Sequence, residues 1–282
     1  MTAIWPQRAV PDMRKNGRFQ GTLRYLYAHW PTYALLYGVM MASLLLMGWA
    51  AEQGWYGLVP LLLALCLVLS YFIVASLWAA YRIYDQINPH QLLFDLGQLH
   101  ETDRFVYLGL GLHQRVFDLS RRLTTGRIVV VDLYNPQLTS GRSLGRLRQR
   151  ARPPLSDPRL NWQTGQVTLL PLPDESVSVV IACEVASAFW QDGDRLALLQ
   201  EARRILTKNG RLLLAERSRS RTNWLTLGPM ATNLPPPDYW RTLLRQAGFQ
   251  VKREHVVGDL IICWRADKPT PGRANQLAFD LE

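Results

Sequence analysis

The sequence contains little of what metal centres and disulfide frameworks require. Its 282 residues include only three cysteines and five histidines. Cys66, Cys183 and Cys263 lie far apart in the chain, and none stands at a metal-ligand spacing from a histidine. We therefore expect no metal site, and we expect each thiol to act as a small apolar filler.

Charge is missing from two long stretches. Residues 31–51 and 55–80 contain no Asp, Glu, Lys or Arg, and each exceeds the roughly 20 residues that cross a bilayer. Three residues separate them, which forces a helical hairpin. Aromatic residues typical of membrane interfaces stand near the ends of the runs: Trp30, Tyr33, Trp49, Trp55, Tyr56 and Trp78. The runs predict a transmembrane hairpin over residues 31–80. The alternative, a buried helical pair in a soluble domain, is disfavoured because such helices usually carry a polar stripe.

Basic residues flank the hairpin on one side. They precede the first run at Arg8, Arg14, Lys15, Arg18 and Arg24. Arg82 follows the second run, whereas the connecting loop carries only Glu52. By the positive-inside rule, both termini and the globular part lie in the cytoplasm. Residues 1–30 are then a basic, partly flexible cytoplasmic arm, and the bilayer is the first expected partner.

The formal net charge of +10 also raises the question of nucleic acid. Arginines gather in two stretches, 142–159 and 217–221, and such stretches can bind a phosphate backbone. On a chain tethered beside an anionic leaflet, attraction to lipid head groups explains the same excess with fewer assumptions. We therefore do not expect nucleic acid as a partner.

Beyond residue 103, strand-like runs alternate with helix-compatible stretches. The first five strands are expected at 105–110, 127–133, 166–172, 178–183 and 211–216. Their alternation with helices predicts parallel pairing through right-handed crossovers. Two further strands, 250–257 and 259–266, are joined by the tight-turn dipeptide Gly258-Asp259 and predict an antiparallel hairpin.

The chain thus divides into an anchor and an α/β domain. A doubly wound, seven-stranded sheet is expected over 104–267. Residues 81–103 are expected to form a linker helix, because Leu92, Leu93, Leu96 and Leu99 share one helical face. The tail at 268–282 bears Pro and Gly and is expected to be mobile.

The end of the first strand carries a short glycine motif. Gly109 and Gly111 follow Tyr107, and glycines at this place let the backbone approach a ligand that a Cβ atom would exclude. Asp132 ends the second strand, 21 residues after Gly111. This is the usual spacing for an acid that accepts hydrogen bonds from both ribose hydroxyls. A helix-capping role is the alternative for Asp132.

Three segments resemble the core of the class I S-adenosylmethionine (SAM) methyltransferases. LPLPDESVSVV at 170–180 is similar to the family's "LPFPDxSFDVV", and LTKNGRL at 206–212 to its "LKPGGxLxLxE". PPDYWRTLLRQAGF at 236–249 is similar to the family's "xxYxxLLxxAGF" helix-turn. The resemblance covers about residues 95–267. It is closest to the methyltransferase type 11 group, which contains the ubiquinone and menaquinone methyltransferases.

The resemblance implies a Rossmann-like seven-stranded sheet and SAM as the cofactor. In the family, the loop at Gly109 and Gly111 wraps the methionine part of SAM. The acid at Asp132 binds the ribose, and Leu133 and Tyr134 then lie against the adenine face. The segment matching Gln166 and Val167 reaches the adenine end, where the family usually has an acid.

The chain departs from the family pattern at three cofactor-loop positions. Tyr107 replaces the leading acid, His113 replaces the third glycine, and Gln166 replaces the adenine-binding acid. All three changes weaken the expected contacts with SAM.

Methyl transfer needs alignment of the reactants, and a base where the acceptor must lose a proton. Glu184, just beyond the fourth strand, is the first candidate base, and His113 is the second. A solvated strand-end carboxylate is the alternative for Glu184. Phe189 and Trp190 follow, and we expect core packing of both rather than substrate contact.

Together these features predict a membrane-anchored SAM-dependent methyltransferase that acts on a lipophilic small molecule near the cytoplasmic leaflet. A methyltransferase-fold protein that has lost catalysis, and serves as an assembly or scaffold factor of a membrane complex, is the alternative. An RNA methyltransferase is a third interpretation, which rests only on the arginine stretches.

Overall fold

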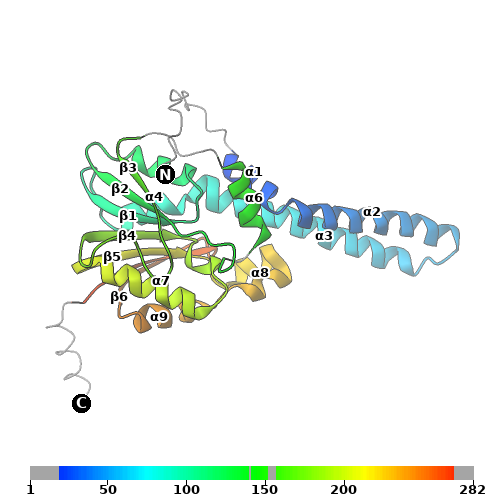
Figure 1. Cartoon of the computed structure of the whole chain (residues 1–282). Coiled ribbons are helices and arrows are strands. Elements are labelled where there is room, and N and C mark those ends of the chain that lie inside the picture. Colours follow the sequence, from blue (N-terminus) through cyan, green and yellow to red (C-terminus); the bar gives the residue numbers. More distant parts are fainter. Residues whose placement is uncertain (1–18, 140, 152–156, 270–282) are drawn as a thin grey trace, which may run out of the picture.

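The computed structural model describes residues 19–139, 141–151 and 157–269. A helical hairpin projects from one side of an α/β domain (Figure 1). Its arms are α2 (Trp30–Glu52) and α3 (Leu58–Ala80), which pack along each other. Both are candidate membrane spans by length and composition, and only 11% and 6% of their apolar windows are buried. A helical pair buried in a soluble domain does not fit these exposed surfaces.

The root of the hairpin is built from three short helices. These are α1 (Gln20–Ala28), the π-helix η1 (Tyr81–Ile87), which continues α3, and α4 (Pro89–Leu96). The expected single linker helix is interrupted at Asn88, which has a φ of +46° and precedes a proline. A proline disfavours helical geometry in the residue before it, so η1 and α4 are separate.

Part of the expected N-terminal arm is ordered as α1. The carboxylate of Asp85 accepts hydrogen bonds from the backbone N–H groups of Gly21 (2.7 Å) and Thr22 (2.9 Å). These N–H groups belong to the first turn of α1, where a helix provides no backbone carbonyl to accept their hydrogen bonds. Asp85 therefore caps α1. Residues 1–18 of the arm and 270–282 of the tail lie outside the described residues.

The sheet has seven strands in the order β3-β2-β1-β4-β5-β7-β6. The strands are β1 (Arg104–Gly109), β2 (Arg127–Asp132), β3 (Leu160–Thr164), β4 (Val177–Cys183), β5 (Leu206–Glu216), β6 (Gln250–Val257) and β7 (Ile261–Asp267). The first five are parallel, and β7 lies antiparallel between β5 and β6. The fold prediction is therefore confirmed. The chain reverses direction of winding between β1 and β4, the place where open α/β sheets bind ligands at the carboxyl ends of strands.

The position predicted for the third strand is wrong. Residues 160–164 pair with β2, whereas the expected strand at 166–172 is a tight loop in which Gln166 and Leu169 form a bridge. As an edge strand, β3 is only partly buried, so LNWQT carries polar residues and lacks the apolar run of a central strand. Val167 and Leu170 are apolar because they fasten the following loop to the core.

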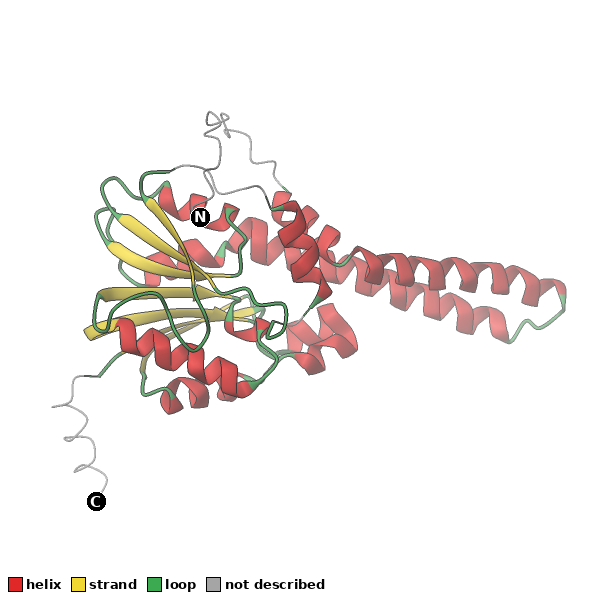
Figure 2. Cartoon of the chain, in the orientation of Figure 1, coloured by secondary structure: helices red, strands yellow, loops and turns green. Residues whose placement is uncertain are grey.

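Helices cover both faces of the sheet (Figure 2). One face packs against α7 (Asp192–Ile205) and α9 (Pro237–Gln246), and the other against α4 and α5 (Gln114–Ser120). Successive side chains of β4 pack on opposite faces of the sheet. Val180 and Ala182 belong to the core beneath α7 and α9, and Ile181 belongs to the core beneath α4 and α5. The remaining helices α6 (Arg142–Arg150), α8 (Arg221–Leu227), η2 (Ala186–Ala188) and η3 (Gly228–Asn233) lie towards the hairpin side or connect elements.

Candidate active site

The predicted site residues lie at the carboxyl-end edge of the parallel strands. Gly109 ends β1, Asp132 ends β2, and Glu184 follows β4. Gly111 has a φ of +75°, in the left-handed region that favours glycine. A Cβ atom at Gly111 would lie 3.0 Å from Oδ2 of Asp132, so this glycine leaves open space directly beside the carboxylate. The glycine motif and the acid therefore form one cradle.

An arginine that the sequence analysis did not single out occupies this cradle. Nη1 of Arg148, on α6, lies 3.0 and 2.8 Å from the two carboxylate oxygens of Asp132. The same atom donates to the carbonyl of Leu110 at 2.7 Å, and the guanidinium lies 4.1 Å from the Tyr134 ring centroid. A Cβ atom at Gly111 would lie 1.6 Å from Nη1. Arg148 thus fills the space that Gly111 leaves.

The cradle residues fit the ribose part of SAM in their chemistry. A carboxylate at a strand end, beside a glycine without a side chain, offers both oxygens to a vicinal diol. Arg148 takes up those same two oxygens. A diol and the Arg148 guanidinium cannot both hold the Asp132 carboxylate in this way, so a ligand bound through Asp132 would require the Arg148 side chain to leave.

The residues expected around the adenine are divided between core and surface. Leu133 and Val167 are buried in the core beside α7, whereas Gln166 is exposed. The N–H of Gly165 donates to the Asp132 carbonyl at 3.0 Å, which holds the end of β3 next to the end of β2. The loop is therefore adjacent to the cradle, and its side-chain contact with a ligand stays a prediction.

His113 stands on the same side as Asp132. It precedes α5, and its ring lies edge-on to Trp162 with centroids 4.6 Å apart. Partial burial lowers the pKa of His113, with a smaller raising effect from Asp132 and a lowering effect from Arg148. Its Nδ1 is buried without a hydrogen-bond partner. A neutral imidazole with an unused nitrogen suits either a proton acceptor or a ligand contact.

Glu184 belongs to a second polar group, at the end of β4. Its Oε1 accepts a hydrogen bond from the Tyr84 hydroxyl at 2.9 Å, and its Oε2 lies 3.1 Å from Nη1 of Arg115. Its side chain is 15% exposed, so it is not the solvated carboxylate of the alternative interpretation. Glu184 also has a φ of +52°. Both oxygens are engaged, so accepting a substrate proton would require Glu184 to exchange a partner.

Glu216, the last residue of β5, is a further acid that the sequence analysis did not assign to the site. It is fully buried, and burial raises its pKa to about 7, against the lowering effect of hydrogen bonds from Ser187 and Ala186. The N–H of Ala186 donates to its Oε1 at 2.8 Å, while Oε2 has no partner. Nearby Glu184 adds to the upward shift. A carboxyl that titrates near neutrality is typical of functional clefts.

Phe189 and Trp190 have different environments in the structure. Phe189 is fully buried in the core, as expected, whereas Trp190 is 66% exposed. The core-packing expectation is wrong for Trp190. Phe189 forms a bridge with Thr139, and the N–H of Trp190 donates to the Leu138 carbonyl. These bonds hold the loop after β4 beside the segment that follows β2.

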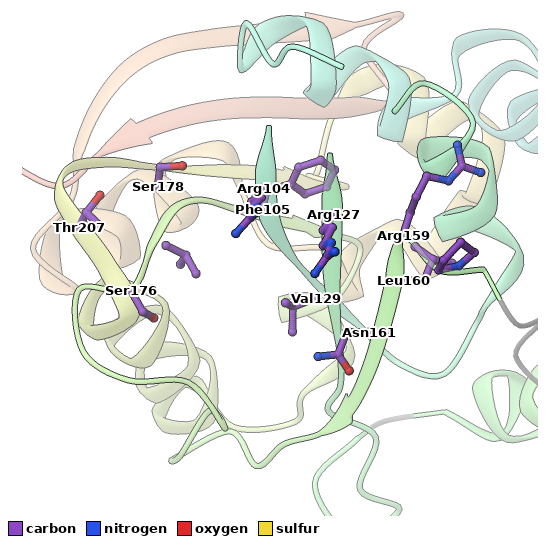
Figure 3. A pocket seen from close by; sticks show the side chains of 12 residues that line it. Arg104, Phe105, Arg127, Val129, Arg159, Leu160, Asn161, Ser176, Ser178 and Thr207 are labelled. Carbon is purple, nitrogen blue, oxygen red and sulfur yellow. The ribbon is translucent and has the colours of Figure 1, made fainter. Parts of the chain in front are cut away.

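A hollow of about 690 Å³ lies at the opposite edge of the sheet (Figure 3). It is lined by the first residues of the strands, among them Arg104, Arg127 and Leu160. It contains none of the predicted site residues. The ligand edge is therefore not identified by concavity but by the convergence of Gly111, Asp132 and Glu184.

Residues 106–214 match the family described as "Methyltransferase domain". No curated protein matches the chain.

Solved structures share the fold at low sequence identity. The [4+2]-cyclase SpnF superposes with a TM-score of 0.50 at 15% identity, over 66% of this chain and 82% of that one. A SAM-dependent methyltransferase from Aquifex aeolicus gives a TM-score of 0.48 at 16% identity, over 64% and 89%. Human N-acetylserotonin methyltransferase in complex with SAM gives 0.48 at 18% identity, over 71% and 56%. The family match and the seven-stranded sheet together lead to one conclusion: residues 106–214 match a methyltransferase domain, and the sheet that contains them has the class I methyltransferase fold.

Proposed function

We propose that this protein is a membrane-anchored methyltransferase that transfers a methyl group from SAM to a lipophilic small molecule near the cytoplasmic leaflet. One observation carries the proposal. The cofactor edge of the sheet adjoins the root of the apolar hairpin, because Tyr84, which continues α3, donates a hydrogen bond to Glu184 at 2.9 Å. An acceptor dissolved in the bilayer would meet this edge of the domain first.

The chain's own residues would bind and orient the reactants. Gly109 and Gly111 let the backbone approach the cofactor, and Asp132 would hold the ribose once Arg148 has moved away. SAM supplies an activated methyl group on its sulfonium. The protein then contributes alignment of the acceptor atom, which is the main source of rate for an in-line displacement.

Two carboxyl groups could accept a proton from the acceptor. Glu184 is the predicted base, and it would have to release Arg115 or the Tyr84 hydroxyl to take up that proton. Glu216 has one unused oxygen and a pKa raised to about 7 by burial, which suits proton exchange near neutral pH. Its burial requires relayed access rather than direct contact.

Cofactor binding is the first test. We would titrate S-adenosylhomocysteine into the full chain in lipid nanodiscs by calorimetry, together with Asp132→Ala. Micromolar binding by the parent and its loss in Asp132→Ala would support the cofactor site. Equal affinity in the two proteins would reject the role of Asp132.

Membrane anchoring needs a separate test. We would place single cysteines in the hairpin loop and in the domain of the chain in intact cells, and treat the cells with an impermeant thiol reagent. Labelling at Gly54→Cys but not at Lys208→Cys is expected if the hairpin tip faces outward. The reverse pattern would reject the cytoplasmic orientation of the domain, and no insertion into membranes would reject the anchor.

The alternative, a methyltransferase-fold assembly factor of a membrane complex, is favoured by one contact. Arg148 holds both oxygens of Asp132, and a scaffold protein would have no reason to release them. Absence of cofactor binding in both the parent chain and Arg148→Ala, with co-purification of a stoichiometric partner, would support this second function.

A further inference from the structure

The short helix α8 buries polar side chains and exposes apolar ones, the reverse of a normal surface helix. Its polar residues Asn223 and Thr226 are buried, whereas Trp224 is 47% and Leu225 60% exposed. The Asn223 side chain donates to the carbonyls of Ser218 and Leu260, at 2.8 Å each. These bonds fix the orientation of α8, so its apolar side chains cannot turn inward.

The exposed apolar side chains continue beyond α8 and are bordered by arginines. Met230, on η3, is 56% exposed. Arg219 precedes α8 and Arg221 is its first residue. Both arginines share an open hollow with Trp224 and Leu225. We refer to Arg219, Arg221, Trp224, Leu225 and Met230 as the α8 patch.

The charge of the α8 patch is positive. Arg219 donates to the carbonyls of Leu234 and Thr232 rather than to an acid. Within the described ranges, neither arginine forms an ion pair with a carboxylate. An acid close to the start of α8, Asp259, accepts a hydrogen bond from the N–H of Thr222.

The α8 patch lies against the hairpin at a definite height. α8 packs on α3 (Figure 1). A Cβ atom at Gly228, which follows α8, would lie 2.8 Å from the Phe72 ring of α3. Trp78 stands six residues beyond Phe72 on the same helix, on the domain side. At a rise of 1.5 Å per residue, the contact is about 9 Å closer to the hairpin tip than Trp78.

This height corresponds to the lipid interface. Trp30 and Trp78 are both exposed at the domain end of the hairpin, where interfacial tryptophans mark the head-group level. A segment about 9 Å closer to the tip lies within the 5–10 Å depth at which interfacial helices bury their apolar face. Trp, Leu and Met beside arginines that form no ion pair match the surface of an anionic leaflet, which attracts basic residues.

We propose that the α8 patch inserts into the head-group and acyl boundary of the leaflet and contacts anionic lipid directly. This inference rests on the membrane anchoring in the proposed function and adds the orientation of the domain to it. The cofactor edge then faces the bilayer, and the hollow of Figure 3 faces away from it. Positive charge and immersion depth favour lipid over a protein partner on this surface.

The experiment measures depth at single labelled positions in the full chain. Leu225→Cys carries a bimane label in vesicles that contain phosphatidylglycerol and phosphatidylcholine brominated near the glycerol. Lys208→Cys, exposed at the opposite edge of the sheet, is the control for the domain. Leu61→Cys, 65% exposed on α3, is the control for hairpin insertion. The three native cysteines are buried, so the parent chain should take up little label.

We expect the label at residue 225 to be quenched about fivefold more strongly than the label at 208, because quenching by bromine requires immersion to the acyl boundary. Arg221→Gln should reduce quenching at residue 225 on anionic vesicles and leave it unchanged on purely zwitterionic ones. If residue 61 is quenched but 225 behaves like 208, the α8 patch proposal is wrong and the anchor stands. If residue 61 is not quenched, the anchor itself fails. A label at 225 that is shielded from both lipid and aqueous quenchers would show that protein covers the patch, and would also overturn the proposal.

Discussion

Replacing Arg148 by alanine should tighten cofactor binding. In the structure, Nη1 of Arg148 lies within 3.0 Å of both oxygens of Asp132 and donates to the Leu110 carbonyl. The two side chains are 28% and 22% exposed, so water screens the pair only in part. Any ligand that uses the Asp132 carboxylate must first break this ion pair.

The expected size of the effect follows from the strength of the pair. A partly exposed, charge-assisted interaction of this kind contributes about 1–2 kcal/mol. Apparent affinity is reduced by the fraction of molecules in which the site is open, so the dissociation constant in Arg148→Ala should fall by about 5- to 30-fold. SAM carries a sulfonium cation, and removal of the guanidinium charge changes affinity in the same direction.

The assay is calorimetric titration of S-adenosylhomocysteine and SAM into the full chain in nanodiscs at two salt concentrations. Arg150→Ala is the matched control, because Arg150 lies on the same helix but stacks on Tyr27, with its guanidinium 3.7 Å from the ring centroid. Its affinity should equal that of the parent. Weaker binding in Arg148→Ala than in Arg150→Ala would refute the reasoning and make Arg148 a cofactor contact.

Three further predictions concern the acids of the site. Asp132→Ala should abolish detectable cofactor binding in a chain that still folds, with a modestly lower unfolding temperature because the ion pair with Arg148 and the hydrogen bond from the Tyr134 N–H are lost; calorimetry and thermal unfolding check the two halves. Burial raises the pKa of Glu216 from 4.5 to about 7 in the folded chain. The contribution of this carboxyl group to the free energy of unfolding is therefore complete below pH 4.5 and is lost as the pH rises through 7. Glu216→Gln should therefore be more stable than the parent at pH 8 by up to about 3 kcal/mol, and similar to it at pH 4.5; equal unfolding curves at pH 8 would contradict this. Glu184→Gln leaves Arg115 without its counter-charge and should lower the free energy of unfolding by about 1–3 kcal/mol, with cofactor affinity unchanged; a large loss of affinity would place Glu184 in the cofactor site.

The sequence predicted the sheet because the signals for central strands are local. Buried parallel strands such as SVVIAC carry unbroken apolar runs, and Gly258-Asp259 marks the reversed hairpin by turn chemistry alone. The edge strand β3 was missed for the converse reason. Residues 160–164 have one partner strand and incomplete burial, so their sequence carries no strand signal strong enough to compete with the apolar loop after it.

The sequence predicted the glycine motif and the acid of the cradle, but it did not predict that Arg148 fills the cradle. Gly111 and Asp132 could be paired from spacing, because both follow adjacent parallel strands. Arg148 is one of several arginines in its stretch, and only the packing of α6 beside α1 selects it for Asp132. The Arg146 side chain donates to the Ala28 carbonyl at 2.9 Å and sets α6 in this place. Such a contact, 118 residues apart in the chain, has no local signature.

The hydrogen bonds from Gly21 and Thr22 to Asp85 give the hairpin a property that neither span has alone. They join the chain just before α2 to the chain just after α3, so the hairpin leaves the domain and returns to it at one point. A protein held by a single flexible tether can swing and sample a broad shell above its attachment. A protein fastened at both ends of a closed loop turns only as the helix pair turns. In the proposed function, its search for lipid-borne molecules would then be reduced from three dimensions to lateral diffusion at one height and one orientation.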